Sequence, residues 1–165
     1  MSDVNLIFIE MDPTTSAATN LICLLDTELR KRYPGMRIHG INPIEFRRRG
    51  GIFLIGKLDG LAVACGALRP LSRDAGEVKR MFVRKDQRGK GFGGGMLNAL
   101  EQIAIRRGYQ SVRLETGANQ PEAIRLYQGM GYRRIPCSRQ SSSGGRTWCF
   151  EKVLPRLFQQ NQSTR

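Results

Sequence analysis

The chain has 165 residues, 40% of them hydrophobic and 25% charged, and it carries a formal net charge of +13 at pH 7. This length fits one domain with its own core, and the composition is that of a globular protein. No apolar run approaches the roughly 20 residues that span a bilayer, so a membrane partner is not expected. The first residues lack the basic start and apolar block of a signal peptide, which favours a cytoplasmic location.

The positive charge is concentrated in the second part of the chain. Residues 71–165 hold eighteen Lys and Arg against seven Asp and Glu. Such a surplus suits a nucleic-acid surface or a groove for a polyphosphate cofactor. It also suits ordinary solvated arginines, and the charge alone leaves these three interpretations open.

The cysteines and the single histidine give no sign of a metal site. The sequence has no CxxC or CxxH spacing, and His39 has no cysteine or second histidine nearby. We therefore predict no metal and no disulfide framework, and expect each cysteine to be a small buried apolar residue. The four cysteines are Cys23, Cys65, Cys137 and Cys149.

The first half of the chain is predicted to form a strand, two helices and a β-hairpin. In chain order we expect a strand over Val4–Glu10, a helix capped by Thr14 or Thr15 and ended by Pro34-Gly35, a short helix over Pro43–Arg49, and strands over 51–57 and 61–68. Asp59-Gly60 separates the last two strands and is typical of a two-residue hairpin turn, so these strands should pair antiparallel.

The second half begins with a predicted βαβ unit. A strand over Glu77–Val83 leads through a glycine-rich turn, Gln87–Gly95, into a helix from Met96 to Arg107, and Ser111–Thr116 forms the next strand. Two strands joined by one helix in this way lie parallel in a sheet.

A shorter helix and two closing strands complete the prediction. Asn119 is expected to cap the helix with Glu122 at its third position, which is a capping box. The closing strands are expected over Tyr132–Ile135 and Trp148–Val153, separated by a polar loop over Ser138–Arg146.

The glycine-rich turn is typical of an anion-binding site. The first amides of a helix have no internal acceptors, and the helix dipole is positive at that end. Glycines let the backbone approach a phosphate closely, and Arg88 and Lys90 add positive charge. The turn therefore predicts a phosphorylated ligand. It is not a dinucleotide fingerprint, which would follow the first strand, and the chain has no Walker motif.

Two motifs follow one another in a fixed order. The first is Arg88-x-x-Gly91-x-Gly93 between a strand and a helix, and the second is Asn119…Ala123-Ile124-x-Leu126-Tyr127-x-x-x-Gly131-Tyr132 after the next strand. Together they resemble the acetyl-CoA-binding core of the GNAT superfamily of N-acetyltransferases. The resemblance covers roughly residues 5–154. Leu114–Gly117 together with Gln120–Ile124 further resembles a bacterial, small-molecule type of these enzymes.

The resemblance implies an α/β (α+β) fold in a single domain over residues 1–154, followed by a flexible tail over 155–165. The expected mixed central sheet has about seven strands, splayed between strands 4 and 5 and flanked by about four helices. The pantetheine arm of acetyl-CoA would lie in that splay as a pseudo-strand.

The resemblance also implies which residues bind the cofactor. Backbone amides from Arg88 to Gly93 would hold the pyrophosphate of acetyl-CoA, and backbone groups of the fourth strand would pair with the pantetheine. The expected cofactor-binding residues are Met81, Phe82, Val83, Arg88, Gly89, Lys90, Gly91, Phe92, Gly93, Gly94, Asn119 and Tyr127.

Acetyl transfer to an amine needs a base for the amine proton and an acid for the leaving thiolate. Glu77 matches a general-base glutamate of the superfamily, with a surface ion pair to Lys79 or Arg113 as its alternative role. Glu115 on the facing strand is a second candidate base, or else a structural hydrogen-bonding group. Tyr127 matches the tyrosine that protonates the sulfur, and its alternative role is core packing.

The expected activity is acetyl transfer from acetyl-CoA to the primary amine of a small molecule, by direct attack in a ternary complex. Arginines in the loops that border the splay, Arg37, Arg47, Arg139 and Arg146, would suit an acidic group on that acceptor. The alternatives are a protein acetyltransferase acting on lysine or an N-terminus, and a non-catalytic CoA-binding or basic nucleic-acid-binding module. Nucleic acid is not the expected partner, and the sequence is compatible with a homodimer as well as a monomer.

Overall fold

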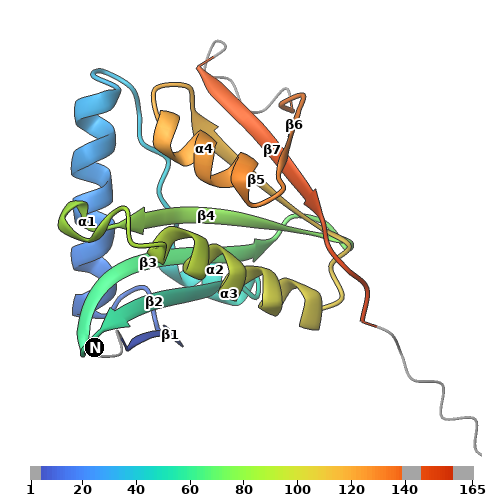
Figure 1. Ribbon diagram of the computed structural model, residues 1–165, viewed down its shortest axis with the longest axis horizontal. Helices are drawn as coiled ribbons and strands as arrows, with labels where there is room; N and C mark the ends of the chain where they lie inside the picture. The colour runs from blue at the N-terminus through green and yellow to red at the C-terminus, as the bar shows by residue number, and fades with distance from the viewer. Residues whose placement is uncertain (1–4, 139–145, 158–165) are drawn as a thin grey trace, which may run out of the picture.

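The computed structural model describes residues 5–138 and 146–157, and over these residues one mixed sheet carries helices on both faces (Figure 1). The strands are β1 (Leu6–Glu10), β2 (Ile52–Leu58), β3 (Leu61–Pro70), β4 (Ala75–Val83), β5 (Ser111–Gly117), β6 (Arg133–Ile135) and β7 (Thr147–Val153). The helices are α1 (Ser16–Arg32), α2 (Pro43–Arg48), α3 (Phe92–Arg106) and α4 (Pro121–Gly129), with a short 3-10 turn, η1 (Lys85–Gln87). The predicted tail and polar loop fall largely on residues 158–165 and 139–145, outside the described residues.

The sheet confirms the predicted splay. Its order is β1-β2-β3-β4-β5-β7-β6, and β4 and β5 are parallel neighbours while the other pairs are antiparallel. Their pairing runs only from Ala75–Val78 to Ser111–Leu114. Because β4 continues to Val83 and β5 to Gly117, the two strands separate beyond this point and leave a wedge between them.

A bulge in β4 lies at the start of the wedge. The register between β3 and β4 passes from Ala67↔Lys79 to Cys65↔Phe82, so two residues of β4 oppose one residue of β3. Arg80 in this bulge has φ 56°, and its buried guanidinium pairs with Asp26 of α1. A bulge re-aims the backbone and its side chains at the point where the strands part.

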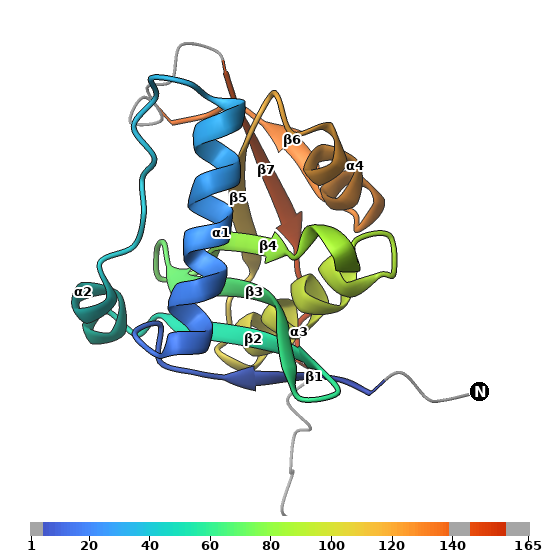
Figure 2. The ribbon, with the colours of Figure 1, turned by 90° about the vertical axis from the view of Figure 1, so that its left-hand side faces the viewer.

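Two core layers cover the faces of the sheet. Helix α3 packs Met96 and Leu100 on one face, and α1 crosses the other face with Leu21 and Leu25 (Figure 2). Gly66 in β3 lets α3 approach, because a Cβ there would lie 2.9 Å from Leu100 Cδ1. The apolar residues of each helix recur at helical spacing and form one face, and this face packs on the sheet.

Local signals in the first half are confirmed. Thr15 caps α1, accepting a hydrogen bond from the Ala18 amide at 3.4 Å. The β2–β3 turn has φ 48° at Asp59 and 84° at Gly60, which fits the expected Asp-Gly hairpin.

Two helix starts differ from the prediction. Helix α3 begins at Phe92, four residues before the expected Met96, because Gly91 at φ 82° reverses the chain and Gly93–Gly95 already form the first turn. Helix α4 has Gln120 at its N-cap position and no side-chain cap, so the Asn119 capping box was wrong. Glu122 pairs with Arg32 instead, and the Asn119 backbone contacts α1 side chains.

The prediction of no disulfide was also wrong. Cys137 and Cys149 form a disulfide, with their Cα atoms 5.3 Å apart. β6 pairs with β7 and ends beside Cys149, which brings together two cysteines that are twelve residues apart in the chain. Cys65 is buried as expected, whereas Cys23 is an exposed free thiol.

Candidate active site

A cavity of about 300 Å³ lies between the end of β4, the glycine-rich turn and α4. Ten of the twelve predicted cofactor residues line it, and Lys90 and Asn119 do not. The ten are Met81, Phe82, Val83, Arg88, Gly89, Gly91, Phe92, Gly93, Gly94 and Tyr127. We call this cavity the cofactor groove.

The glycine-rich turn at one end of the groove has the geometry of an anion site. Gly89 and Gly91 have φ near 80°, and a Cβ at either would meet nothing within 4 Å. The first intrahelical bond of α3 runs from the Gly95 amide to the Gly91 carbonyl at 3.0 Å, so the preceding amides have no intrahelical acceptor. A Cβ at Gly93 would lie 3.1 Å from Leu126 of α4. These features fit the pyrophosphate of acetyl-CoA.

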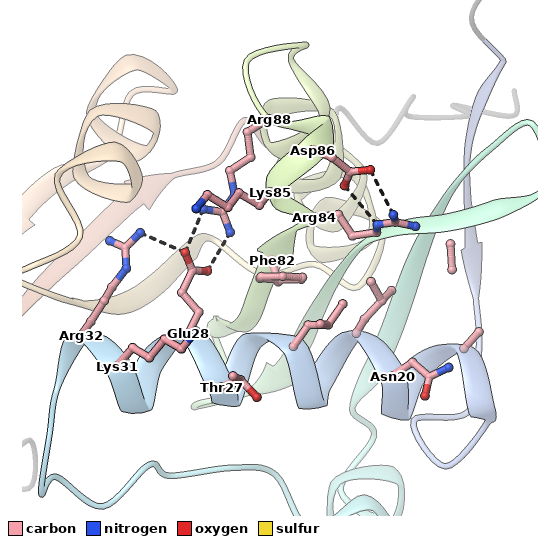
Figure 3. A pocket seen from close by; sticks show the side chains of 14 residues that line it. Asn20, Thr27, Glu28, Lys31, Arg32, Phe82, Arg84, Lys85, Asp86 and Arg88 are labelled. Carbon is pink, nitrogen blue, oxygen red and sulfur yellow. Dashed lines mark hydrogen bonds and ion pairs between the residues drawn. The ribbon is translucent and has the colours of Figure 1, made fainter.

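The guanidinium of Arg88 bonds to groups outside this turn. Its Nε donates to the Val83 carbonyl at 2.9 Å, and its two terminal nitrogens donate to both carboxylate oxygens of Glu28 on α1, at 2.8 and 2.7 Å (Figure 3). Lys90 donates to Gln87 at 3.0 Å. In this arrangement the guanidinium charge of Arg88 is compensated by Glu28.

The Glu28 carboxylate belongs to a network of charged side chains. Arg32, one turn further along α1, bonds Glu28 at 3.1 Å, the Asn119 carbonyl at 3.1 Å, and Glu122 of α4. Hydrogen bonding by Arg88 holds the pKa of Glu28 below its ordinary value. This network thus links α1, the glycine-rich turn and α4. On its far side lies a cavity of about 1050 Å³ between α1 and the end of β4 (Figure 3).

Replacing Glu28 by Gln is expected to tighten acetyl-CoA binding while it weakens the fold. The freed guanidinium of Arg88 becomes available to phosphate, so the Kd for acetyl-CoA should fall by about three- to tenfold in calorimetry, more at low salt. The free energy of unfolding should fall by about 1 kcal/mol. Glu45→Gln, which breaks exposed pairs on α2, is the matched control. A weaker complex would show that Glu28 orients Arg88 for the cofactor instead.

Tyr127 lies on α4 and lines the cofactor groove. It is buried, with its ring 6.0 Å from that of Tyr132 and 6.1 Å from that of Phe150. Burial raises the pKa of the Tyr127 hydroxyl, and the hydroxyl has no hydrogen-bond partner among the described residues. A protonated hydroxyl facing the groove can donate to a developing anion.

Glu77 is buried in the paired part of β4. Its carboxylate accepts from Arg69 Nε at 2.8 Å and lies 3.5 Å from Lys79 Nζ, so both oxygens have cationic partners. It lies opposite Arg113 of β5, before the strands separate, and lines neither the cofactor groove nor the pocket described next.

Glu115 is exposed and lines a second pocket, of about 200 Å³, at the end of β5. The loop after α1, the end of β5 and the start of β7 form this acceptor pocket. Arg37 and Arg146 line it as the sequence suggested, together with His39. Arg47 instead pairs with Asp12 on another surface, and Arg139 lies outside the described residues.

Gln120 lines both the cofactor groove and the acceptor pocket. Its side-chain oxygen accepts from the Gly117 amide at 3.2 Å and from the Tyr33 hydroxyl at 3.5 Å. The Tyr33 hydroxyl also accepts from the Asn119 amide at 3.1 Å. Tyr33, at the end of α1, therefore fixes the turn that separates the two spaces.

Sequence reasoning assigned no role to Glu28, Tyr33 or Gln120, although Gln120 belongs to one of the motifs that resemble the family. The spacing of Glu28 and Arg32 at i,i+4 on one helix face was a local signal for an ion pair, but not for its link to Arg88. Gln120 precedes the proline that begins α4, and the adjacent residues in the sequence do not indicate that it lines two cavities.

No helix within residues 5–138 and 146–157 is long and apolar enough to cross a membrane. Over the same ranges, no three His, Cys, Asp or Glu side chains form a group that could hold a metal ion.

Comparison with known proteins places this geometry in a family. The model of the acetyltransferase (GNAT) family matches residues 20–132. An IAA acetyltransferase from Azospirillum brasilense is 34% identical over 121 residues, which cover 73% of this chain and 79% of that protein. Other relatives are longer: the chain covers 35% of N-acetyltransferase family 8 member 2 from Rattus norvegicus, at 35% identity.

Solved structures have the same fold. A candidate acyl-CoA N-acyltransferase from Klebsiella pneumoniae superimposes with a TM-score of 0.76 at 28% identity, over 90% of this chain and 97% of that one. A GNAT family acetyltransferase from Elizabethkingia anophelis, with acetyl-CoA bound, gives 0.68 at 17% identity, over 91% and 99% of the two chains. The chain therefore belongs to the GNAT family of acetyl-CoA-dependent acetyltransferases.

Proposed function

We propose that the protein transfers the acetyl group of acetyl-CoA to a primary amine of a small molecule, by direct attack in a ternary complex. The observation that carries this proposal is the position of Gln120, which lines the cofactor groove on one side and the acceptor pocket on the other. Two adjoining spaces allow both substrates to be bound at once. We also propose a cytoplasmic location. Sedimentation measurements would distinguish a homodimer from a monomer.

Two protein groups would move protons in this reaction. The amine nitrogen bonds to the acetyl carbon as the bond from carbon to sulfur breaks. Glu115 would accept the amine proton, directly or through water, because its exposed carboxylate lines the acceptor pocket. Tyr127, which lines the cofactor groove, would donate a proton to the leaving sulfur. We place Glu115 ahead of Glu77 as the base, since two cations already hold the buried carboxylate of Glu77.

Initial-rate measurements with both substrates varied test the ternary complex. An acceptor is first identified by measuring thiol release with a panel of amino acids, polyamines, aminoglycosides and peptides. Intersecting double-reciprocal lines are expected, whereas parallel lines would indicate an acetylated enzyme and contradict direct attack. Preferred acetylation of peptides would favour a protein acetyltransferase, and salt-steep DNA binding without turnover would favour a basic module.

Matched variants distinguish the two candidate bases. Glu115→Gln is expected to lower kcat at neutral pH by about 100-fold with an unchanged Kd for acetyl-CoA, since general-base catalysis contributes at least that much. Glu77→Gln should instead lower the free energy of unfolding, because Arg69 and Lys79 lose their buried partner. A large loss of kcat confined to Glu77→Gln would reverse the assignment.

A further inference from the structure

Two arginines of the acceptor pocket differ from many others in the chain. Nine arginines form ion pairs with carboxylates in the described structure, including Arg32, Arg69 and Arg88. Arg37 and Arg146 have no carboxylate partner among residues 5–138 and 146–157, although both line the same pocket. Both side chains are exposed, and two guanidinium groups without carboxylate partners in one pocket can bind an acidic group.

The backbone brings these two cations together from distant parts of the chain. The Arg146 carbonyl accepts a hydrogen bond from the Ala118 amide at 2.7 Å, which fixes the start of β7 against the end of β5. The Arg146 guanidinium reaches to 3.7 Å from the sulfur of Met36, and Arg37 is the next residue. Met36 is in turn held by a bond from its amide to the Tyr33 carbonyl at 3.2 Å.

The pocket also holds the opposite charge. Glu115 lines it from β5, and Gln120 marks the side that joins the cofactor groove. The volume of about 200 Å³ is below the range of roughly 300–1,000 Å³ that is usual for drug-sized ligands. The pocket therefore offers two cations and one anion to a molecule of about the size of an amino acid.

We propose that the acceptor is a small amino acid-like molecule, whose carboxylate binds Arg37 and Arg146 while its amine faces Glu115. This inference rests on the proposed acetyl transfer and names the class of its acceptor. The ion pairs with the carboxylate orient the molecule so that its amine, and not its acidic end, points toward Gln120 and the cofactor groove.

The test compares matched acceptors that differ only at the acidic group. Each amino acid is assayed beside its primary amide and its decarboxylated amine, with wild type, Arg37→Gln and Arg146→Gln. The control is Arg73→Gln, which removes an equal charge from an exposed turn between β3 and β4. Each pocket variant should lower kcat/KM for the amino acid by about tenfold or more. It should leave kcat/KM for the amide and the Kd for acetyl-CoA within about twofold of wild type.

The possible failures are distinguishable. Equal use of the amide and the amino acid by wild type, or equal losses in Arg73→Gln, would overturn the carboxylate inference and leave acetyl transfer intact. A preference for aminoalkyl phosphonates over amino acids would replace the carboxylate by a phosphate-type group. No turnover with any amine, despite acetyl-CoA binding, would overturn the proposed function and this inference together.

Discussion

Replacing Tyr127 by Phe is expected to lower kcat by about 100-fold, the lower range of general acid catalysis, while the Kd for acetyl-CoA stays within about threefold. The substitution removes only a hydroxyl oxygen, and the ring keeps its contacts with Tyr132 and Phe150. Because burial raises the pKa of Tyr127 above its ordinary value of 10.0, the hydroxyl is protonated throughout the neutral range. Ionisation of Tyr127 should therefore cause no loss of activity below about pH 10. Thiol-release assays across pH measure kcat and its pH dependence, and calorimetry measures the Kd for acetyl-CoA.

Tyr132→Phe is the matched control for this prediction. Tyr132 contacts the Tyr127 ring, but its hydroxyl donates to the buried Glu101 at 3.0 Å, away from the cofactor groove. This variant should lose about 1–3 kcal/mol of unfolding free energy and keep its kcat. If both variants lost kcat equally, packing around α4 would explain the effect, and the proton-donor role of Tyr127 would fall.

Replacing Gly117 by Ala is expected to disturb the fold and the acceptor pocket together. A Cβ at position 117 would overlap the Tyr33 hydroxyl oxygen and its ring, so Tyr33 must leave its bond to the Asn119 amide. We expect the free energy of unfolding to fall by about 2–4 kcal/mol, since overpacking and the loss of a partly buried hydrogen bond combine. Urea denaturation measures this change, and acceptor KM should rise more than the Kd for acetyl-CoA.

Gly129→Ala gives the comparison at the end of α4. A Cβ there meets nothing within 4 Å, and the substitution should stabilise the protein slightly, by up to about 1 kcal/mol. A Gly117→Ala protein with wild-type stability and acceptor KM would mean that Tyr33 does not fix the turn between the two spaces.

The sequence predicted those parts of the fold that are encoded by short segments. The Asp59-Gly60 hairpin, the Thr15 cap and the order of strand, glycine turn and helix depend on neighbouring residues, and the structure confirms them. The start of α3 was missed because the glycines were read as a loop, whereas Gly93–Gly95 are helical. Glycine is needed at position 95 because a Cβ there would lie 2.9 Å from Phe8.

The remaining features depend on residues that are distant in the chain. Arg88 meets Glu28 only because α1 lies across the end of β4, and this contact joins residues sixty positions apart. The disulfide depends on the pairing of β6 with β7, in a segment where the sequence gives no register signal. Composition identified the acidic and basic residues, but not which of them compensate one another.

The half-paired junction of β4 and β5 gives the molecule an uneven resistance to hydrogen exchange. Four residue pairs, from Ala75↔Ser111 to Val78↔Leu114, join the two parts of the sheet, whereas β5 and β7 share seven. Amides of β4 that point into the wedge beyond Val78 lack a strand partner there and should exchange with deuterium rapidly in the free protein. A ligand that lies along them as an added strand would slow this exchange, so deuterium uptake of β4 reports how far the bound molecule completes the sheet.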